Sequence, residues 1–168
     1  MVAKIICRTC SEISGAYLEK ELNTLRKSGN ANNGHSFSHG ESIFLEHNIR
    51  GIRGEAADGF PSVQKTGLPV LESLISKGYD IDYASSVSLL NLIADTHDTN
   101  MIHRTSFETA SRVKNEISKL LENNPFPDIS AIQSIDQKFI NLNLSPGGCA
   151  DLLGATLFFH YLSNSQDL

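Results

Sequence analysis

The sequence predicts an all-α protein, a single helical bundle of about six to seven helices joined by long functional loops. Apolar residues recur at helical spacing along most of the chain, and no segment alternates convincingly with period two. At 168 residues the chain fits one domain with a core of its own. We therefore expect residues 1–168 to form a single helical domain.

Composition narrows the class of protein. The net charge of −5 argues against a nucleic-acid binder, which needs a basic face to neutralise phosphates. The sequence contains no apolar run long enough to span a bilayer, so no membrane partner is expected. The three cysteines, an odd count without a recognisable export signal, predict reduced thiols and a cytoplasmic protein.

The first helix is expected at residues 2–27. Its predicted buried face consists of Ile6, Cys10, Ile13, Tyr17 and Leu25. Cys7 and Cys10 form a C-x-x-C pattern, but no strand precedes it, so core packing is the preferred interpretation for Cys10. A mobile Gly-, Asn- and Ser-rich loop at 28–38 and a short helix at 38–47 are predicted to follow.

Residues 50–67 are predicted to form an ordered loop. Residues 50–63 contain three glycines, one proline and four charged side chains, without a helical apolar stripe beneath them. Phe60 and Val63 would anchor this loop. Ordered loops of such length in compact domains are usually functional.

The later helices are more regular. They are expected at 68–77, 83–95, 106–122, 129–141 and 148–163. Gly78 is predicted to end the first of these, and Asp82 to cap the second. Thr105 and Glu108 would form a capping box for the third. The last is apolar nearly all round and should be central in the bundle.

The first loop, Arg50 to Ser62, carries candidate phosphate and metal ligands. Arg50 and Arg53 would clamp phosphate oxygens with paired donors. Glu55 and Asp58 would bind a metal or act as a base. A surface loop whose charges pair among themselves is an equally good interpretation.

The second loop, Asp95 to Arg104, is dense in polar groups. It holds two aspartates, an asparagine, two histidines and an arginine. Such a cluster at a helix end suits a metal–phosphate unit or acid–base chemistry. His97 alone suggests only a cap, whereas His103 and Arg104 could both face an anion. We favour function over simple capping here.

The third loop, Leu144 to Asp151, is a Ser-Pro-Gly-Gly turn that enters an apolar helix. Free backbone N–H groups at such a turn would bind an anion. Taken alone, a tight turn with a serine cap is slightly the better interpretation. Asp151 has apolar neighbours, so we expect it to be partly buried.

Four stretches together resemble one family. They are RGEAADGFPSV at 53–63, GLP at 67–69, DTNMIHR at 98–104 and LSPGGCADLL at 144–153. The sequence resembles triphosphoribosyl-dephospho-CoA synthase, which makes the prosthetic-group precursor of citrate lyase and of malonate decarboxylase. Family proteins are longer at the N-terminus and carry upstream motifs not found here. The chain is therefore expected to correspond to the C-terminal part of such a protein, as a fragment or a short form.

The resemblance implies that ATP donates its triphosphoribosyl group to the 2′-hydroxyl of 3′-dephospho-CoA and that adenine leaves. The candidate bases are Asp98 and Glu55. The candidate phosphate ligands are Arg53, His103, Arg104, Ser145, Gly147 and Gly148. The candidate Mg²⁺ ligands are Asp58, Asn100 and Asp151, besides Asp98. In a full-length version of the protein, the substitution Asp98→Asn is expected to abolish adenine release and to leave the fold intact.

Two other functions remain open from the sequence. One is a non-catalytic nucleotide- or CoA-binding module. The other is a metal-assisted hydrolase of a phosphorylated ribose compound, with water as the acceptor. Self-association into a homo-oligomer is a further open possibility, because an absent N-terminal half would leave apolar surface uncovered.

Overall fold

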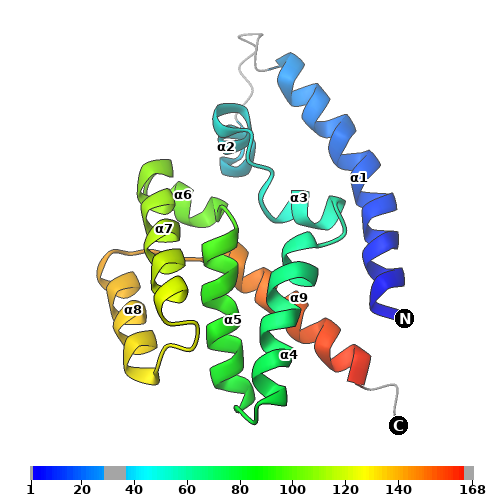
Figure 1. The fold of residues 1–168 in the computed structure, drawn as a ribbon. Helices are drawn as coiled ribbons and strands as arrows, with labels where there is room; N and C mark the ends of the chain where they lie inside the picture. Colours follow the sequence, from blue (N-terminus) through cyan, green and yellow to red (C-terminus); the bar gives the residue numbers. More distant parts are fainter. Residues whose placement is uncertain (1, 29–36, 165–168) are drawn as a thin grey trace. The chain divides into compact units, whose positions relative to one another are not determined.

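The computed structural model describes residues 2–28 and 37–164 (Figure 1). Across these residues the chain is all-α, as predicted. The elements are α1 (Val2–Ser28), α2 (His39–His47), α3 (Gly51–Ala57), the π-helical turn η1 (Val63–Gly67), α4 (Leu68–Ser76), α5 (Ile81–Asp95), α6 (Thr99–Arg104), α7 (Phe107–Asn123), α8 (Ile129–Asn141) and α9 (Gly147–Asn164). The nine α-helices of the described residues outnumber the six or seven predicted.

The chain divides into two compact units, Met1–Pro61 and Ser62–Leu168, which we call the first and the second unit. The single domain stays a prediction, and each unit is described by itself. The expected mobile loop at 28–38 falls mostly on residues 29–36, which lie outside the described residues.

The first unit is built on α1. Its core cluster consists of Leu18, Leu22, Leu25, Phe44 and Ala57. The helix α2 begins with a capping box, in which the Ser38 hydroxyl accepts from the Glu41 N–H and the Ser38 N–H donates to the Glu41 carboxylate at 2.7 Å.

The buried face of α1 differs from the predicted one. Ile13 and Tyr17 were expected inside, yet each is 69% exposed, and Cys10 is only half-buried. Another side of α1 is also apolar, and α3 packs against that side. There the Ser11 hydroxyl donates a hydrogen bond to the Ala57 carbonyl at 2.8 Å. Helical periodicity alone does not distinguish two such stripes on one helix.

The ordered loop predicted at 50–67 is also wrong, because most of it is helical. Gly51 and Gly59 adopt positive φ angles, 56° and 77°, on either side of α3, so these glycines mark the ends of a helix. Gly54 lies inside α3 at a tight contact, where an added Cβ would stand 2.5 Å from the Arg50 Cβ. The glycines that suggested a loop therefore allow a short helix to begin, pack and end.

The second unit is organised around α5. This helix contacts α4, α7, α9 and η1, and Figure 1 shows it between α4 and α7. The α4–α5 core cluster consists of Leu71, Leu74, Ala84 and Val87, all fully buried. The turn η1 lies against α9 so closely that a Cβ on Gly67 would stand 2.3 Å from the Thr156 hydroxyl.

Two predicted helix caps are displaced by one or two residues. Asp80, and not Asp82, caps α5 by accepting from the Tyr83 N–H at 2.9 Å. Ser106, and not Thr105, caps α7 by accepting from the Thr109 N–H at 3.1 Å. Several cap-forming residues stand in a row at both sites, and the backbone selects the one with extended φ and ψ.

The last helix, α9, contacts α4, α5, α6 and η1, which agrees with its predicted central place. It is not buried on all sides, because Phe158 and Tyr161 are more than half exposed. Among the described helices, neither α9 nor any other combines the length and apolar character of a transmembrane span.

Candidate functional site

The second and third loops meet at Asp98. This residue caps α6, where its Oδ1 accepts from the N–H groups of Asn100 at 2.9 Å and Met101 at 3.0 Å. Its Oδ2 accepts from the N–H of Cys149, in the first turn of α9, at 2.8 Å. The Asp98 side chain is only 7% exposed. One buried carboxylate therefore joins the N-termini of two helices.

Two glycines make this junction possible. A Cβ on Gly147 would stand 2.2 Å from the Asn100 Nδ2, and a Cβ on Gly148 would stand 3.2 Å from the Asp98 Oδ2. The Gly-Gly pair thus lets α9 approach α6 at close range. The predicted role of these glycines in phosphate binding stays a prediction, and the structure adds a packing role.

This geometry bears on what Asp98 can do. Its two oxygens accept three backbone N–H groups, which hold the carboxylate in place. It also lies at the positive ends of two helix dipoles. These contacts suit a residue that positions the site, whereas its assignment as the base stays a prediction.

Cys149, whose N–H binds Asp98, is buried next to the junction. Its thiol contacts the Thr96 hydroxyl at 3.2 Å, and the residue is 1% exposed. Burial raises the pKa of this thiol to about 12, and the neighbouring Asp98 charge adds to the rise. Cys149 is therefore held as a neutral thiol and is not an activated nucleophile.

The remaining predicted residues of these loops lie around the junction. Asn100, His103 and Arg104 are exposed, and Ser145 is half-buried. Asp151 is exposed, so the expectation that it is partly buried is wrong. It lies in α9, just past the first turn.

A second polar cluster lies at the C-terminal end of α5, and sequence reasoning missed part of it. The Lys114 ammonium donates to the Asp95 carbonyl at 2.5 Å, and the Thr66 hydroxyl donates to the Asp95 carboxylate at 2.8 Å. His97 stacks on Phe107 with ring centroids 5.7 Å apart. Burial, followed by the charge of Lys114, lowers the pKa of His97. Lys114 belongs to no motif, and only the packing of α7 on α5 brings it here.

The predicted residues of the first loop all lie in the first unit. Arg50 donates to Asp58 at 3.2 Å and forms an ion pair with it. Arg53 forms an ion pair with Glu21 of α1. The Asp58 carboxylate is therefore paired with Arg50. This pair agrees with the interpretation that the charges of the first loop pair among themselves. Glu55 is half-buried on α3.

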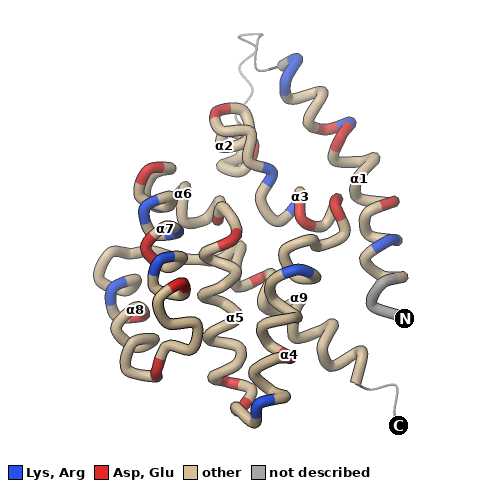
Figure 2. The backbone as a smooth tube through the Cα atoms, viewed as in Figure 1, with Lys and Arg blue, Asp and Glu red and all other residues tan. Residues whose placement is uncertain are grey.

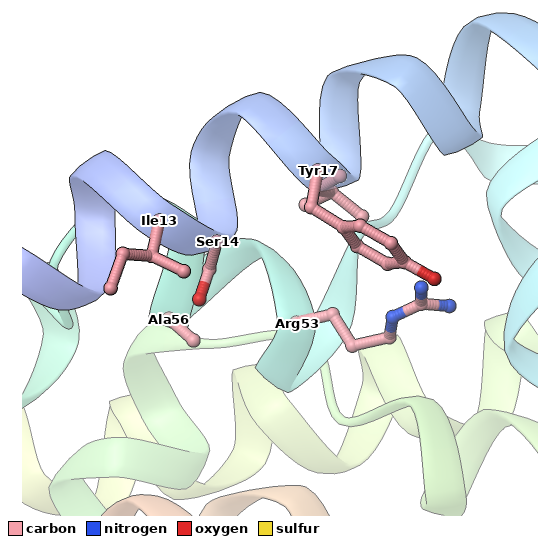
Figure 3. A pocket seen from close by; sticks show the side chains of 6 residues that line it. Ile13, Ser14, Tyr17, Arg53 and Ala56 are labelled. Carbon is pink, nitrogen blue, oxygen red and sulfur yellow. The ribbon is translucent and has the colours of Figure 1, made fainter.

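Arg53 also borders an open hollow between α1 and α3. The hollow has a volume of about 510 Å³ and is lined by Ile13, Ser14, Tyr17, Leu18, Arg53 and Ala56. In Figure 3 the side chains of Tyr17 and Arg53 extend alongside each other at one end, away from Ile13 and Ala56. An exposed aromatic ring beside a cation is a combination that suits a base and a phosphate.

Charges are mixed along the helices. In Figure 2 both signs follow each other on α1 and on α7. The cations predicted to bind phosphate lie on other helices, Arg53 on α3 and His103 and Arg104 on α6.

The described residues do not form a ready-made metal site. Within residues 2–28 and 37–164, no group of three or more His, Cys, Asp and Glu side chains is arranged to hold a metal ion. Of the predicted ligands, Asn100 and Asp151 are exposed in the second unit, and Asp58 pairs with Arg50 in the first.

Comparison with known proteins gives a consistent result. The CitG family model, described as ATP:dephospho-CoA triphosphoribosyl transferase, matches residues 2–168. A protein of Streptococcus mutans named "Probable 2-(5''-triphosphoribosyl)-3'-dephosphocoenzyme-A synthase" is 33% identical over 159 residues, which cover 94% of this chain and 52% of that protein. A Streptococcus pyogenes serotype M49 protein of the same name is 33% identical over 163 residues, with the same two coverages. No solved structure matches. The chain spans about half the length of the curated relatives it matches.

Proposed function

The chain belongs to the ATP:dephospho-CoA triphosphoribosyl transferase family, and from this we propose that it takes part in moving the triphosphoribosyl group of ATP to the 2′-hydroxyl of 3′-dephospho-CoA. The observation that carries the proposal is the match of the family over residues 2–168. The Asp98 junction supports it, because two of the motifs that resemble the family share one buried carboxylate. The product would be the precursor of the citrate lyase prosthetic group or of its malonate decarboxylase counterpart.

The reaction is a displacement at the anomeric carbon of ATP. The bond from this carbon to adenine N9 breaks, and a bond to the acceptor 2′-oxygen forms. The hydroxyl proton passes to a base, and adenine leaves with a proton taken from a donor. Such displacements have oxocarbenium-like transition states, so a carboxylate near the carbon and cations on the phosphates stabilise them.

Residue roles follow from the chemistry of the side chains. The candidate bases are Asp98 and Glu55. Asp98 accepts three backbone N–H groups, so we also assign it the positioning of α6 and α9. We assign phosphate binding to Arg53, His103, Arg104, Ser145, Gly147 and Gly148. The exposed ring of Tyr17 beside Arg53 supports a nucleotide contact in the first unit.

We propose Mg²⁺ only as a companion of the ATP phosphates. The described residues do not fit a protein-built metal cage, since no acidic cluster is present among them. Mg²⁺ commonly binds through substrate phosphates and one or two carboxylates, for which the exposed Asp151 is available.

A second candidate function is a non-catalytic module that binds the nucleotide substrates. The observation that favours it is the exposed Tyr17 ring beside Arg53, because an aromatic ring and a cation bind a nucleotide without any catalytic group. A metal-assisted hydrolase is not favoured by any contact in the structure and serves as an outcome of the test.

Incubation of the chain with ATP, Mg²⁺ and 3′-dephospho-CoA, with adenine measured by chromatography, tests the proposal. Adenine release that depends on dephospho-CoA is the expected result. In that assay Arg104→Gln should raise the KM for ATP, while Arg112→Gln, an exposed arginine on α7, should not. Binding of both substrates without release would favour the module, and release with water alone would favour the hydrolase.

A further inference from the structure

An apolar cleft separates α5 from α8 in the second unit. It has a volume of about 380 Å³, within the range of small-molecule sites. Leu89, Leu90 and Ile93 line it from α5, and Ile135 and Phe139 line it from α8. Two facing apolar helix surfaces normally close on each other, because an empty gap forfeits packing energy.

The few polar groups of the cleft define its chemistry. They are Ser86, Gln133 and Asp136, so no cation lines the cleft and the only charge is negative. The hydroxyl and the amide would pair with amide or hydroxyl groups of a ligand. A phosphate would meet repulsion from Asp136 and find no cation to bind it. The cleft therefore suits an uncharged, mainly apolar chain that carries a few amides.

One end of the cleft reaches the third loop. Leu144 and Pro146 belong to its lining, and they stand on either side of Ser145. Gly147 follows at once, and the N–H of Cys149 binds Asp98. The order along the molecule is thus apolar cleft, then predicted phosphate-binding turn, then the Asp98 junction.

We propose that this cleft binds the pantetheine arm of the dephospho-CoA acceptor. Resting on the proposed function, the assignment matches the order of groups in that molecule. An uncharged arm with two amides leads to a diphosphate, and the diphosphate leads to the ribose that carries the reacting hydroxyl. The arm would occupy the α5–α8 cleft, the diphosphate would lie at Ser145–Gly148, and the ribose would face the second loop.

Pantetheine itself is the probe that tests the cleft without any reaction. It is titrated into the ¹⁵N-labelled chain, and inorganic triphosphate is titrated in parallel. Pantetheine should shift amides of residues 86–93 and 132–140, and triphosphate should not. If pantetheine leaves these amides unchanged, or if triphosphate shifts them instead, the assignment is overturned.

Cleft-filling variants give the second arm. Leu89→Trp should weaken binding of pantetheine and of dephospho-CoA at least about tenfold. Its matched control is Leu142→Trp, at a leucine that is 52% exposed and does not line the cleft. If Leu89→Trp unfolds, Ser86→Leu fills the cleft with a smaller side chain, and the exposed Ser134→Leu on α8 is its control. Equal affinities in a cleft variant and its control would refute the assignment.

Charge reversal tests whether the ligand of the cleft is uncharged. Asp136→Lys should leave pantetheine affinity nearly unchanged, and a loss of pantetheine affinity of about tenfold or more would contradict the assignment. The proposed function fails separately. If pantetheine maps to the cleft but dephospho-CoA does not trigger adenine release, only the transfer activity is refuted. If a folded cleft-filling variant releases adenine with an unchanged KM for dephospho-CoA, only the cleft assignment is refuted.

Discussion

The substitution Asp98→Asn should destabilise the second unit, contrary to the expectation from sequence that it leaves the fold intact. The amide keeps one oxygen, which can still accept from the N–H groups of Asn100 and Met101. Its NH₂ group then replaces Oδ2 and faces the N–H of Cys149, so two donors oppose each other at a buried position.

The magnitude follows from these contacts. A buried N–H without an acceptor costs about 1–3 kcal/mol. The two remaining hydrogen bonds lose their charged acceptor, which makes each of them weaker. We therefore expect the free energy of unfolding to fall by about 2–4 kcal/mol.

Urea denaturation followed by circular dichroism measures this change. The matched control is Asp128→Asn at the start of α8, where the aspartate accepts from the Ala131 N–H at 2.8 Å on an exposed surface. Asparagine caps helices about as well as aspartate, so this control should change stability by less than about 0.5 kcal/mol. If Asp98→Asn is as stable as Asp128→Asn, the buried three-acceptor role of Asp98 is wrong.

Three further predictions concern the same junction. Gly147→Ala should lower the free energy of unfolding by about 1–2 kcal/mol, since the new Cβ would meet the α6 asparagine. Its control Gly154→Ala, with open space around it, should raise stability by up to about 1 kcal/mol in the same assay. The Cys149 thiol, with its pKa raised to about 12, should resist iodoacetamide at pH 8. Peptide mass mapping should show that Cys10 reacts first. Rapid labelling of Cys149 in the folded protein would contradict its burial. The folded pKa of Cys149 lies above the unfolded value of 9.0. Its contribution to the free energy of unfolding is therefore complete below pH 9 and declines as the pH rises from 9 towards 12. Denaturation at alkaline pH, with Cys149→Ser as the reference, measures this decline.

The later helices could be placed closely from the sequence. The predicted 129–141 matches α8 without change, and 148–163 differs from α9 by one residue at each end. Local chemistry sets these limits, because a cap, a proline or a glycine affects the backbone of only the few residues next to it in the sequence. Neighbouring cap candidates are harder to rank, and the caps of α5 and α7 were each misplaced for that reason.

The region 50–67 shows where local rules fail. Its glycines carry the composition of a loop, yet Gly54 is buried inside α3 at a contact too close for a side chain. A glycine that terminates a helix and a glycine that allows close packing look the same in the sequence. Only the folded backbone separates them, because it brings the Arg50 Cβ, four residues earlier, against the position of a Gly54 Cβ.

The sequence by itself determined the helical class, most helix limits and the family. Each of these depends on residues near one another in the chain or on a run of motifs. The tertiary structure alone decided that Asp98 binds the N-terminus of α9, that Lys114 reaches the end of α5, and that α1 exposes Tyr17. These facts depend on which helix faces pack together. Packing brings together residues that are far apart in the sequence, such as Asp98 and Cys149, and no local sequence pattern predicts such a contact.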